Sequence, residues 1–208
     1  MSNYSYLALG DSYTIGEQVA FAENFPNQTV QLLRRQGFPF QAAEIIAKTG
    51  WTTDELHDAI TQTRILAGYH IVSLLIGVNN QYRGRSVVEF KIEFEQLLQK
   101  AIAFANNKPN RVFVLSIPDW SVTPFAEARL PDGQGRDRKQ VADDIDTYND
   151  ICETSAKEFK TRFINITSSQ RADGADAAFL ATDGLHPSGK EYTKWAIQLS
   201  EAVLKELS

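Results

Sequence analysis

Short apolar runs alternate with longer amphipathic stretches along the whole chain. A short run bounded by turn residues is typical of a strand buried on both faces, and an amphipathic stretch is typical of a helix that covers such a strand. The alternation therefore predicts βαβ units and a parallel sheet. The expected strands are Tyr4–Leu9, Ala42–Ala47, His70–Ile76, Arg111–Ser116 and Arg162–Ile166, and the expected helices cover residues 25–36, 52–66, 86–106, 138–160 and 189–206.

Signals at the ends of these helices support the assignment. Thr52, Ser86 and Ser188 are each followed three positions later by a glutamate, the pattern of a capping box that satisfies free backbone N–H groups in the first helical turn. Gly37 and then Pro39 end the first helix. We expect an α/β fold, a three-layer α/β/α flavodoxin-like sandwich with a five-stranded parallel sheet and right-handed crossovers.

Composition places this fold in an ordinary globular protein. The chain has 208 residues and no repeat or linker, which predicts a single domain over residues 1–208. The net charge of -5 and the lack of a basic stripe argue against nucleic acid as a partner. No apolar stretch approaches the length of a membrane span, so no integral membrane segment is expected. The sequence does not indicate an oligomeric state.

Cysteine and histidine usage bears on compartment and metals. Cys152 is the single cysteine, which excludes an internal disulfide and fits a reducing compartment. It lies on the apolar stripe of the predicted helix 138–160, so we expect a buried small side chain rather than a reactive thiol. The N-terminus shows no signal peptide, which favours the cytoplasm, although a sequence trimmed of its signal would look the same. Three scattered histidines offer no zinc spacing, and neither metal nor cofactor is expected.

A serine, an aspartate and a histidine follow predicted elements where an α/β sheet builds its sites. Ser12 lies in the Gly-Asp-Ser-Tyr block 10–13, directly after the first strand, and Asp183 and His186 lie in the Asp-Gly-Leu-His-Pro block 183–187, before the last helix. The carboxyl ends of parallel strands form the binding edge of such sheets. A serine hydroxyl attacks an acyl carbon when an imidazole takes its proton and a carboxylate orients the imidazole.

Two further blocks follow predicted strands and carry hydrogen-bond donors. Gly50 lies in Thr-Gly-Trp, after the second strand, and Asn79 lies in Gly-Val-Asn-Asn, after the third. A glycine N–H and an asparagine amide are suitable donors to the oxyanion that develops during acyl transfer. Each residue also has a simpler interpretation. Ser12 can cap a helix, Gly50 can allow a turn with a positive φ angle, and the Asn79 side chain can bond its own backbone.

The four blocks together resemble the SGNH hydrolases, also called GDSL esterases or lipases, over nearly the whole chain. The four letters correspond to Ser12, Gly50, Asn79 and His186. The resemblance implies a serine esterase that hydrolyses carboxylic esters through an acyl-enzyme and needs no cofactor. It assigns the nucleophile to Ser12 and the base to His186, oriented by Asp183. It also implies an oxyanion hole formed by the N–H groups of Ser12 and Gly50 and by the Asn79 amide.

Two positions depart from the pattern of that family. Tyr13 stands where the first block often has leucine, and we expect this change to alter packing only. Asn80 stands where the third block often has aspartate. The oxyanion role of Asn79 is unaffected, whereas the hydrogen bonds that the missing carboxylate would accept are left open.

The substrate is less well defined than the chemistry. Residues 117–138 are rich in proline and glycine and follow the fourth strand, which predicts either a wall of the substrate pocket or a packed surface loop. The candidate pocket residues are Trp51, Tyr82, Trp120 and Phe125, for each of which core or surface placement is an equal alternative. The acidic character favours a small-molecule ester with a short acyl or acetyl group, possibly on carbohydrate.

Two other functions fit parts of the sequence. The hydroxyl-rich segment 12–16 resembles a phosphate-binding loop, which would make the protein a flavodoxin-like, FMN-binding electron carrier. Asp11 and Glu17 place negative charge on both sides of such a phosphate, and the other three blocks would have no role. An acyltransferase or thioesterase could use the same serine, and only product analysis separates these from an esterase.

Overall fold

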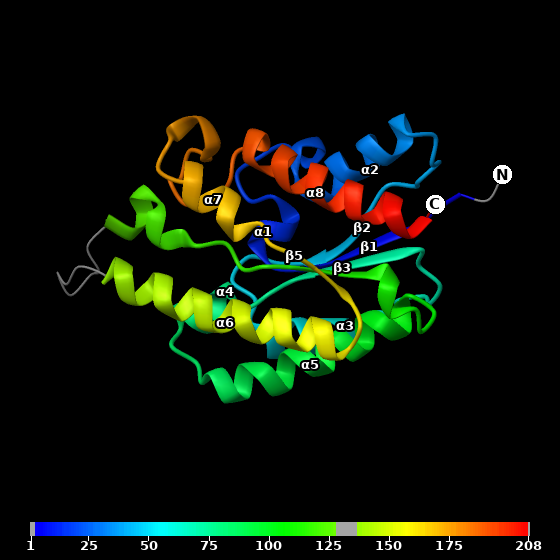
Figure 1. The fold of residues 1–208 in the computed structure, drawn as a ribbon, viewed down its shortest axis with the longest axis horizontal. Coiled ribbons are helices and arrows are strands. Elements are labelled where there is room, and N and C mark those ends of the chain that lie inside the picture. Colours follow the sequence, from blue (N-terminus) through cyan, green and yellow to red (C-terminus); the bar gives the residue numbers. More distant parts are fainter. Residues whose placement is uncertain (1–2, 128–136, 208) are drawn as a thin grey trace.

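A five-stranded parallel sheet forms the centre of the computed structural model, which describes residues 3–127 and 137–207 (Figure 1). The strand order β2-β1-β3-β4-β5 is that of flavodoxin-like sheets. All four neighbouring pairs run parallel, which confirms the predicted fold class. The strands are β1 (Tyr6–Gly10), β2 (Glu44–Ala47), β3 (Ile71–Leu75), β4 (Val112–Leu115) and β5 (Arg162–Ile164).

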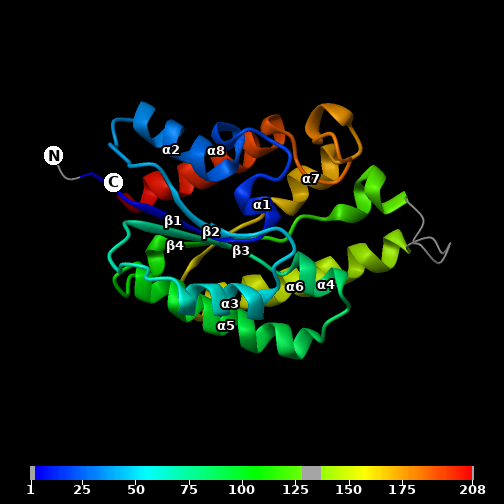
Figure 2. The same cartoon turned by 180° about the vertical axis from the view of Figure 1, so that it is seen from behind.

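Helices cover both faces of this sheet, giving the expected three layers (Figures 1 and 2). One face carries α1 (Ser12–Ile15), α2 (Phe25–Arg35), α7 (Thr167–Asp173) and α8 (Gly189–Leu207). The other carries α3 (Thr53–Gln62), α4 (Val78–Tyr82), α5 (Val87–Phe104) and α6 (Arg138–Glu158). Short 3-10 helices are η1 (Phe21–Glu23), η2 (Pro109–Arg111), η3 (Trp120–Val122), η4 (Pro124–Glu127) and η5 (Ala177–Phe179).

Burial along the strands follows their place in the sheet. Every residue of the inner strands β1, β3 and β4 is buried, whereas the edge strands β2 and β5 are partly exposed. Helices on both faces exclude water from the inner strands, so these strands are almost continuously apolar instead of alternating. The exception is Ser73 in β3, whose buried hydroxyl bonds to the Tyr6 hydroxyl at 2.8 Å. The described buried apolar side chains form one cluster, which includes Cys152 as predicted, and burial raises the pKa of its thiol.

Of the three predicted capping boxes, the one at Thr52 is present. The carboxylate of Glu55 accepts the N–H of Thr52 at 2.9 Å, as a capping box requires. Ser86 is an N-cap without the predicted box, because its Oγ accepts the N–H of Val88 at 3.2 Å and not that of Glu89. The short helices α1, α4 and α7 were not expected, since so few residues show no helical period.

The capping box predicted at Ser188 is wrong. The Ser188 hydroxyl donates instead to the carbonyl of Ala178 at 2.9 Å. Glu191, the proposed partner, is buried, and its Oε1 accepts from the indole N–H of Trp195 at 3.0 Å and the hydroxyl of Ser169 at 2.8 Å. Tertiary contacts, which local spacing does not encode, therefore determine where this carboxylate points.

No helix within the described residues 3–127 and 137–207 combines the length and the apolar character needed to cross a bilayer.

Candidate active site

Ser12 stands at the point where β1 ends and α1 begins. The preceding Asp11 is the N-cap of α1, and its Oδ1 accepts the N–H of Tyr13 at 3.0 Å. Complete burial raises the pKa of the Asp11 carboxyl to about 7, against the lowering effect of its backbone hydrogen bonds. Ser12 itself is 5% exposed, so its hydroxyl faces a site that is largely shielded from water.

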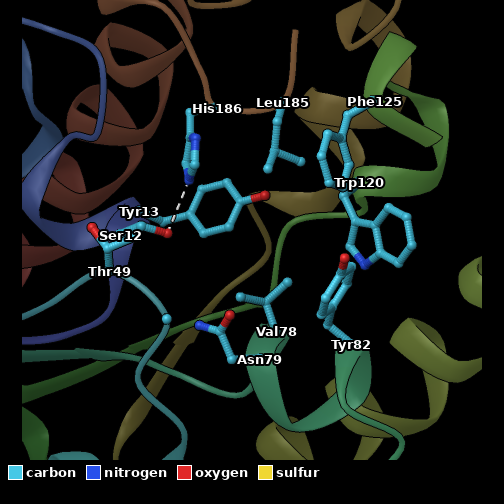
Figure 3. A pocket seen from close by; sticks show the side chains of 11 residues that line it. Ser12, Tyr13, Thr49, Val78, Asn79, Tyr82, Trp120, Phe125, Leu185 and His186 are labelled. Carbon is cyan, nitrogen blue, oxygen red and sulfur yellow. Dashed lines mark hydrogen bonds between the residues drawn. The ribbon is translucent and has the colours of Figure 1, made fainter. Parts of the chain in front are cut away.

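His186 joins this serine to an aspartate. Its Nε2 lies 2.9 Å from the Oγ of Ser12, and its Nδ1 lies 2.6 Å from the Oδ2 of Asp183 (Figure 3 shows the first contact). A carboxylate accepts hydrogen bonds, which assigns the proton of the neutral ring to Nδ1 and leaves Nε2 to accept the serine proton. Ser12 and His186, 174 positions apart in the sequence, thus lie within hydrogen-bond distance.

Asp183 is held in place by its own loop. Its Oδ1 accepts the backbone N–H groups of Leu185 and His186, both at 3.0 Å. Partial burial acts to raise the pKa of this carboxyl, but the hydrogen bonds from the His186 ring and from the two backbone groups outweigh it and hold the pKa below its ordinary value. The carboxyl group is therefore ionised at neutral pH, as orienting an imidazole requires.

Gly50 and Asn79 approach the serine from the two strands that flank β1. Gly50 has φ of +84°, a conformation that glycine adopts without strain. The Nδ2 of Asn79 donates one hydrogen to the carbonyl of Trp51 at 3.0 Å, and its second hydrogen remains for another acceptor. In Figure 3 this nitrogen points toward the side of the cavity where Ser12 lies.

A cavity of about 240 Å³ opens in front of these groups. Four of the five residues proposed for the chemistry line it, while Asp183 lies behind His186. Among the four candidate pocket residues, Tyr82, Trp120 and Phe125 line the cavity, whereas Trp51 does not and reaches the site through its carbonyl. The lining residues are Ser12, Tyr13, Thr49, Gly50, Val78, Asn79, Tyr82, Trp120, Phe125, Leu185 and His186.

Comparison with protein families agrees with this geometry. Residues 8–194 match the model of the GDSL-like lipase/acylhydrolase family, a span that contains all five residues of the proposed chemistry. The chain belongs to the GDSL-like lipase/acylhydrolase family. It is therefore a hydrolase of a family that cleaves ester bonds, and the resemblance seen in the sequence is confirmed. A comparison with curated protein sequences found no match.

Solved structures of GDSL and other esterases share the fold. The acetylxylan esterase Axe2 from Geobacillus stearothermophilus has 17% identity and a TM-score of 0.74, covering 97% of this chain and 94% of that one. The lipase/acylhydrolase from Enterococcus faecalis has 15% identity and a TM-score of 0.72, covering 98% and 96%. The psychrotrophic esterase EstA from Pseudoalteromonas sp. has 14% identity and a TM-score of 0.67, covering 99% of both. At these identities the likeness concerns the fold alone.

Asn80, which replaces the aspartate frequent in GDSL proteins, makes two hydrogen bonds to the start of α3. Its Oδ1 accepts the N–H of Thr53 at 3.1 Å, and its Nδ2 donates to the Thr53 hydroxyl at 2.6 Å. That hydroxyl donates in turn to the carboxylate of Glu93 on α5. Asn80 thus links α4 to the start of α3, and the hydroxyl of Thr53 continues the link to α5.

Tyr13, which replaces the leucine of the family's first block, packs beside the imidazole. Its ring centroid lies 5.1 Å from that of His186, at an interplanar angle of 50°, and the side chain is 2% exposed. Tyr13 thus packs on the ring that would act as base. Tyr13 also lines the cavity, which the sequence did not indicate.

Arg83 ties the Gly50 loop to the start of α3. Its Nη2 donates to the carbonyl of Gly50 at 2.6 Å, and its Nη1 lies 3.4 Å from a carboxylate oxygen of Glu55. Together with the Asn79 bond to Trp51, this contact holds the loop after β2 from the side of α4. Sequence patterning does not indicate this role, since an arginine beyond a short, unpredicted helix has many possible partners.

The described part of the long segment 117–138 forms a wall of the cavity. Residues 117–127 contain η3 and η4, which contribute Trp120 and Phe125 to the lining, as one of the two sequence interpretations expected. Residues 128–136 lie outside the described residues. Over residues 3–127 and 137–207, no group of three or more histidine, cysteine, aspartate and glutamate side chains is arranged to hold a metal ion.

Proposed function

We propose that this hydrolase is a carboxylic ester hydrolase whose nucleophile is Ser12. The observation that carries the proposal is the continuous series of contacts from Ser12 Oγ to His186 Nε2 at 2.9 Å and from His186 Nδ1 to Asp183 Oδ2 at 2.6 Å. Nucleophile, base and orienting carboxylate at hydrogen-bond distance are the recurrent requirement for serine hydrolysis on unrelated folds.

The proposed reaction begins with transfer of the Ser12 proton to His186 as the serine oxygen attacks the ester carbonyl. The carbonyl oxygen gains negative charge, which the backbone N–H groups of Ser12 and Gly50 and the Asn79 amide stabilise. The His186 cation, stabilised by ionised Asp183, then protonates the leaving alcohol and an acyl-enzyme remains. Water attacks this ester by the same steps, which releases the acid and restores the hydroxyl.

We further propose a small ester as the substrate. The cavity volume of about 240 Å³ fits a small acyl or alcohol group rather than a long chain. The acetylxylan esterase Axe2 shares the fold, which agrees with the sequence-based preference for a short acyl or acetyl group. An acyltransferase or a thioesterase would use the same serine. The acyltransferase would differ from an esterase in the acyl acceptor, and the thioesterase would differ in the leaving group.

The flavin-binding alternative has less support. The N–H of Tyr13, which would face a phosphate at the start of α1, already donates to the Asp11 carboxylate. The hydroxyl of Ser12 is within hydrogen-bond distance of His186, and α1 has only four residues. A helix this short provides little of the dipole that favours anions.

Labelling with a reactive phosphonate ester tests the proposed nucleophile. Attack by Ser12 on phosphorus displaces the alcohol or phenol of the phosphonate ester and forms a stable tetrahedral adduct. Mass spectrometry should therefore find the phosphonyl group on the peptide that contains Ser12, with parallel loss of esterase activity. Ser12→Ala should remain unlabelled. Ser168→Ala, which changes an exposed serine of α7, should label as the wild type does. Label on another residue would contradict the assignment.

Asn79→Ala should lower kcat by about 10²–10³-fold and leave KM nearly unchanged, because an oxyanion donor acts mostly in the transition state. Initial rates over a range of ester concentrations measure both constants. Asn110→Ala is the matched control, since Asn110 is exposed and donates to Glu206 far from the cavity. A rise in KM at constant kcat would instead indicate that Asn79 only binds substrate.

A further inference from the structure

The cavity has two chemically different ends. Ser12, His186 and Asn79 form a polar end, where the ester group would react. Across from Ser12, Figure 3 shows the side chains of Tyr82, Trp120 and Phe125 together. Val78 and Leu185 complete this second end, which we call the apolar end.

The three aromatic rings of the apolar end contact one another. The ring centroids of Tyr82 and Trp120 are 5.5 Å apart at an interplanar angle of 64°, and those of Trp120 and Phe125 are 6.1 Å apart at 70°. These edge-to-face arrangements are the ones that aromatic rings prefer. Trp120 is only 4% exposed, so packing fixes its orientation. The rings therefore offer a surface of defined shape.

The polar group of the most buried ring on this surface is engaged within the protein. The indole N–H of Trp120, its only polar group, donates to the Oε1 of Gln81 at 2.9 Å. Gln81 donates in turn to a carboxylate oxygen of Asp144 at 3.3 Å. Phe125, Leu185 and Val78 carry no polar side-chain atoms. A sugar ring placed against these three side chains and the Trp120 ring would lose hydrogen bonds to water that they do not replace, which costs binding energy.

The volume suits one ring. An apolar cavity of about 150 Å³ in another protein binds benzene. The cavity here, at about 240 Å³, holds a ring of that size together with the atoms that connect it to an ester carbonyl. A flat ring also gains from edge-to-face contacts that a flexible alkyl chain cannot make, and it loses less conformational entropy on binding.

We propose that the apolar end binds an aromatic ring carried by the ester, on either its acyl or its alcohol side, so that arylalkyl esters are the preferred substrate class. This inference rests on the proposed function, since it assigns the specificity of the same site. It departs from the sequence-based preference for acetylated carbohydrate.

Hydrolysis of five esters, followed by proton release at constant pH, tests the proposal. They are methyl acetate, methyl phenylacetate, benzyl acetate, methyl hexanoate and a per-acetylated methyl xyloside. Nitrophenyl esters are avoided because their leaving group is itself an aromatic ring. One ring-bearing ester should exceed methyl acetate, methyl hexanoate and the acetylated sugar in kcat/KM by at least about tenfold. If methyl phenylacetate is the better substrate, the ring binds as part of the acyl group. If benzyl acetate is better, the ring binds as part of the alcohol.

A variant links the preference to the apolar end. Tyr82→Ala should reduce the ratio of kcat/KM between the preferred ring-bearing ester and methyl acetate by at least about threefold. Tyr82 is 49% exposed, so its removal is compatible with folding. Phe21→Ala, which removes an aromatic side chain that is 65% exposed and does not line the cavity, should leave the ratio unchanged.

Failure of the inference differs from failure of the proposed function. If methyl acetate is hydrolysed in a Ser12-dependent manner and methyl hexanoate or the acetylated sugar equals or exceeds both ring-bearing esters, the aromatic preference is overturned and the esterase proposal stands. An unchanged ratio in Tyr82→Ala also overturns the inference. If none of the five esters is hydrolysed in a Ser12-dependent manner, both the inference and the proposed function are overturned.

Discussion

Ser12→Ala should lower kcat for ester hydrolysis by at least about 10⁴-fold, the scale seen when a serine nucleophile is removed from other hydrolases. Without the hydroxyl, no acyl-enzyme forms, and only the oxyanion donors and substrate binding remain to assist water. Steady-state hydrolysis of a simple ester with purified protein measures the loss. Circular dichroism and thermal unfolding establish that the variant is folded.

Ser168→Ala provides the comparison for this experiment as well, because the exposed Ser168 donates to the nearby Asn165. It should retain the activity of the wild type. If Ser12→Ala keeps more than about a tenth of the wild-type kcat, another group attacks the ester, because loss of the true nucleophile costs far more.

Asp183→Asn should lower kcat by about 10³–10⁴-fold with a small change in KM. The ionised carboxylate accepts the Nδ1 proton of His186 at 2.6 Å, whereas an amide can donate to that nitrogen and favour the tautomer with the proton on Nε2. That tautomer cannot accept the proton of Ser12. Initial rates near pH 8 measure the effect, since the pKa of Asp183 lies below its ordinary value and the wild-type carboxylate is fully ionised there.

Asp58→Asn is the matched substitution, because the Asp58 side chain is 76% exposed on α3 and should leave kcat unchanged. A decrease of less than about tenfold in Asp183→Asn would mean that His186 does not depend on this carboxylate for its orientation. The backbone N–H groups of Leu185 and His186 also bond to Asp183, and an amide oxygen can still accept both. Asp183→Asn should therefore keep the loop in place and change the hydrogen bond to the imidazole.

The sheet could be predicted from sequence because its inner strands are buried on both faces. In β1, residues such as Leu7 and Leu9 are fully buried, so an unbroken apolar run marks the strand. Its end was less well defined: the strand extends to Gly10, which apolar patterning does not register. The amphipathic helices α2, α3, α5, α6 and α8 followed from their own periodicity in the same way.

The candidate site was predictable where chemistry restricts the residue type. A nucleophile, a base and its carboxylate allow few alternatives, so Ser12, His186 and Asp183 could be named before their distances were known. Cavity walls accept many side chains, which is why Trp51 was expected to line the cavity while Leu185 was not considered. The hydrophobic pattern of a strand is local in the sequence. The arrangement of loops depends instead on contacts between distant segments.

The register of the sheet allows the substrate preference to change without moving the proposed reacting groups. Gly10 pairs with Ala47 on one side and with Leu75 on the other, so the three loops that carry Ser12, Gly50 and Asn79 leave adjacent strands at one level. The spacing of the proposed reacting groups is thereby set by backbone hydrogen bonding. Trp120 and Phe125 of the apolar end come from η3 and η4, which follow β4, so these side chains can be exchanged to admit other esters while the reacting atoms keep their positions.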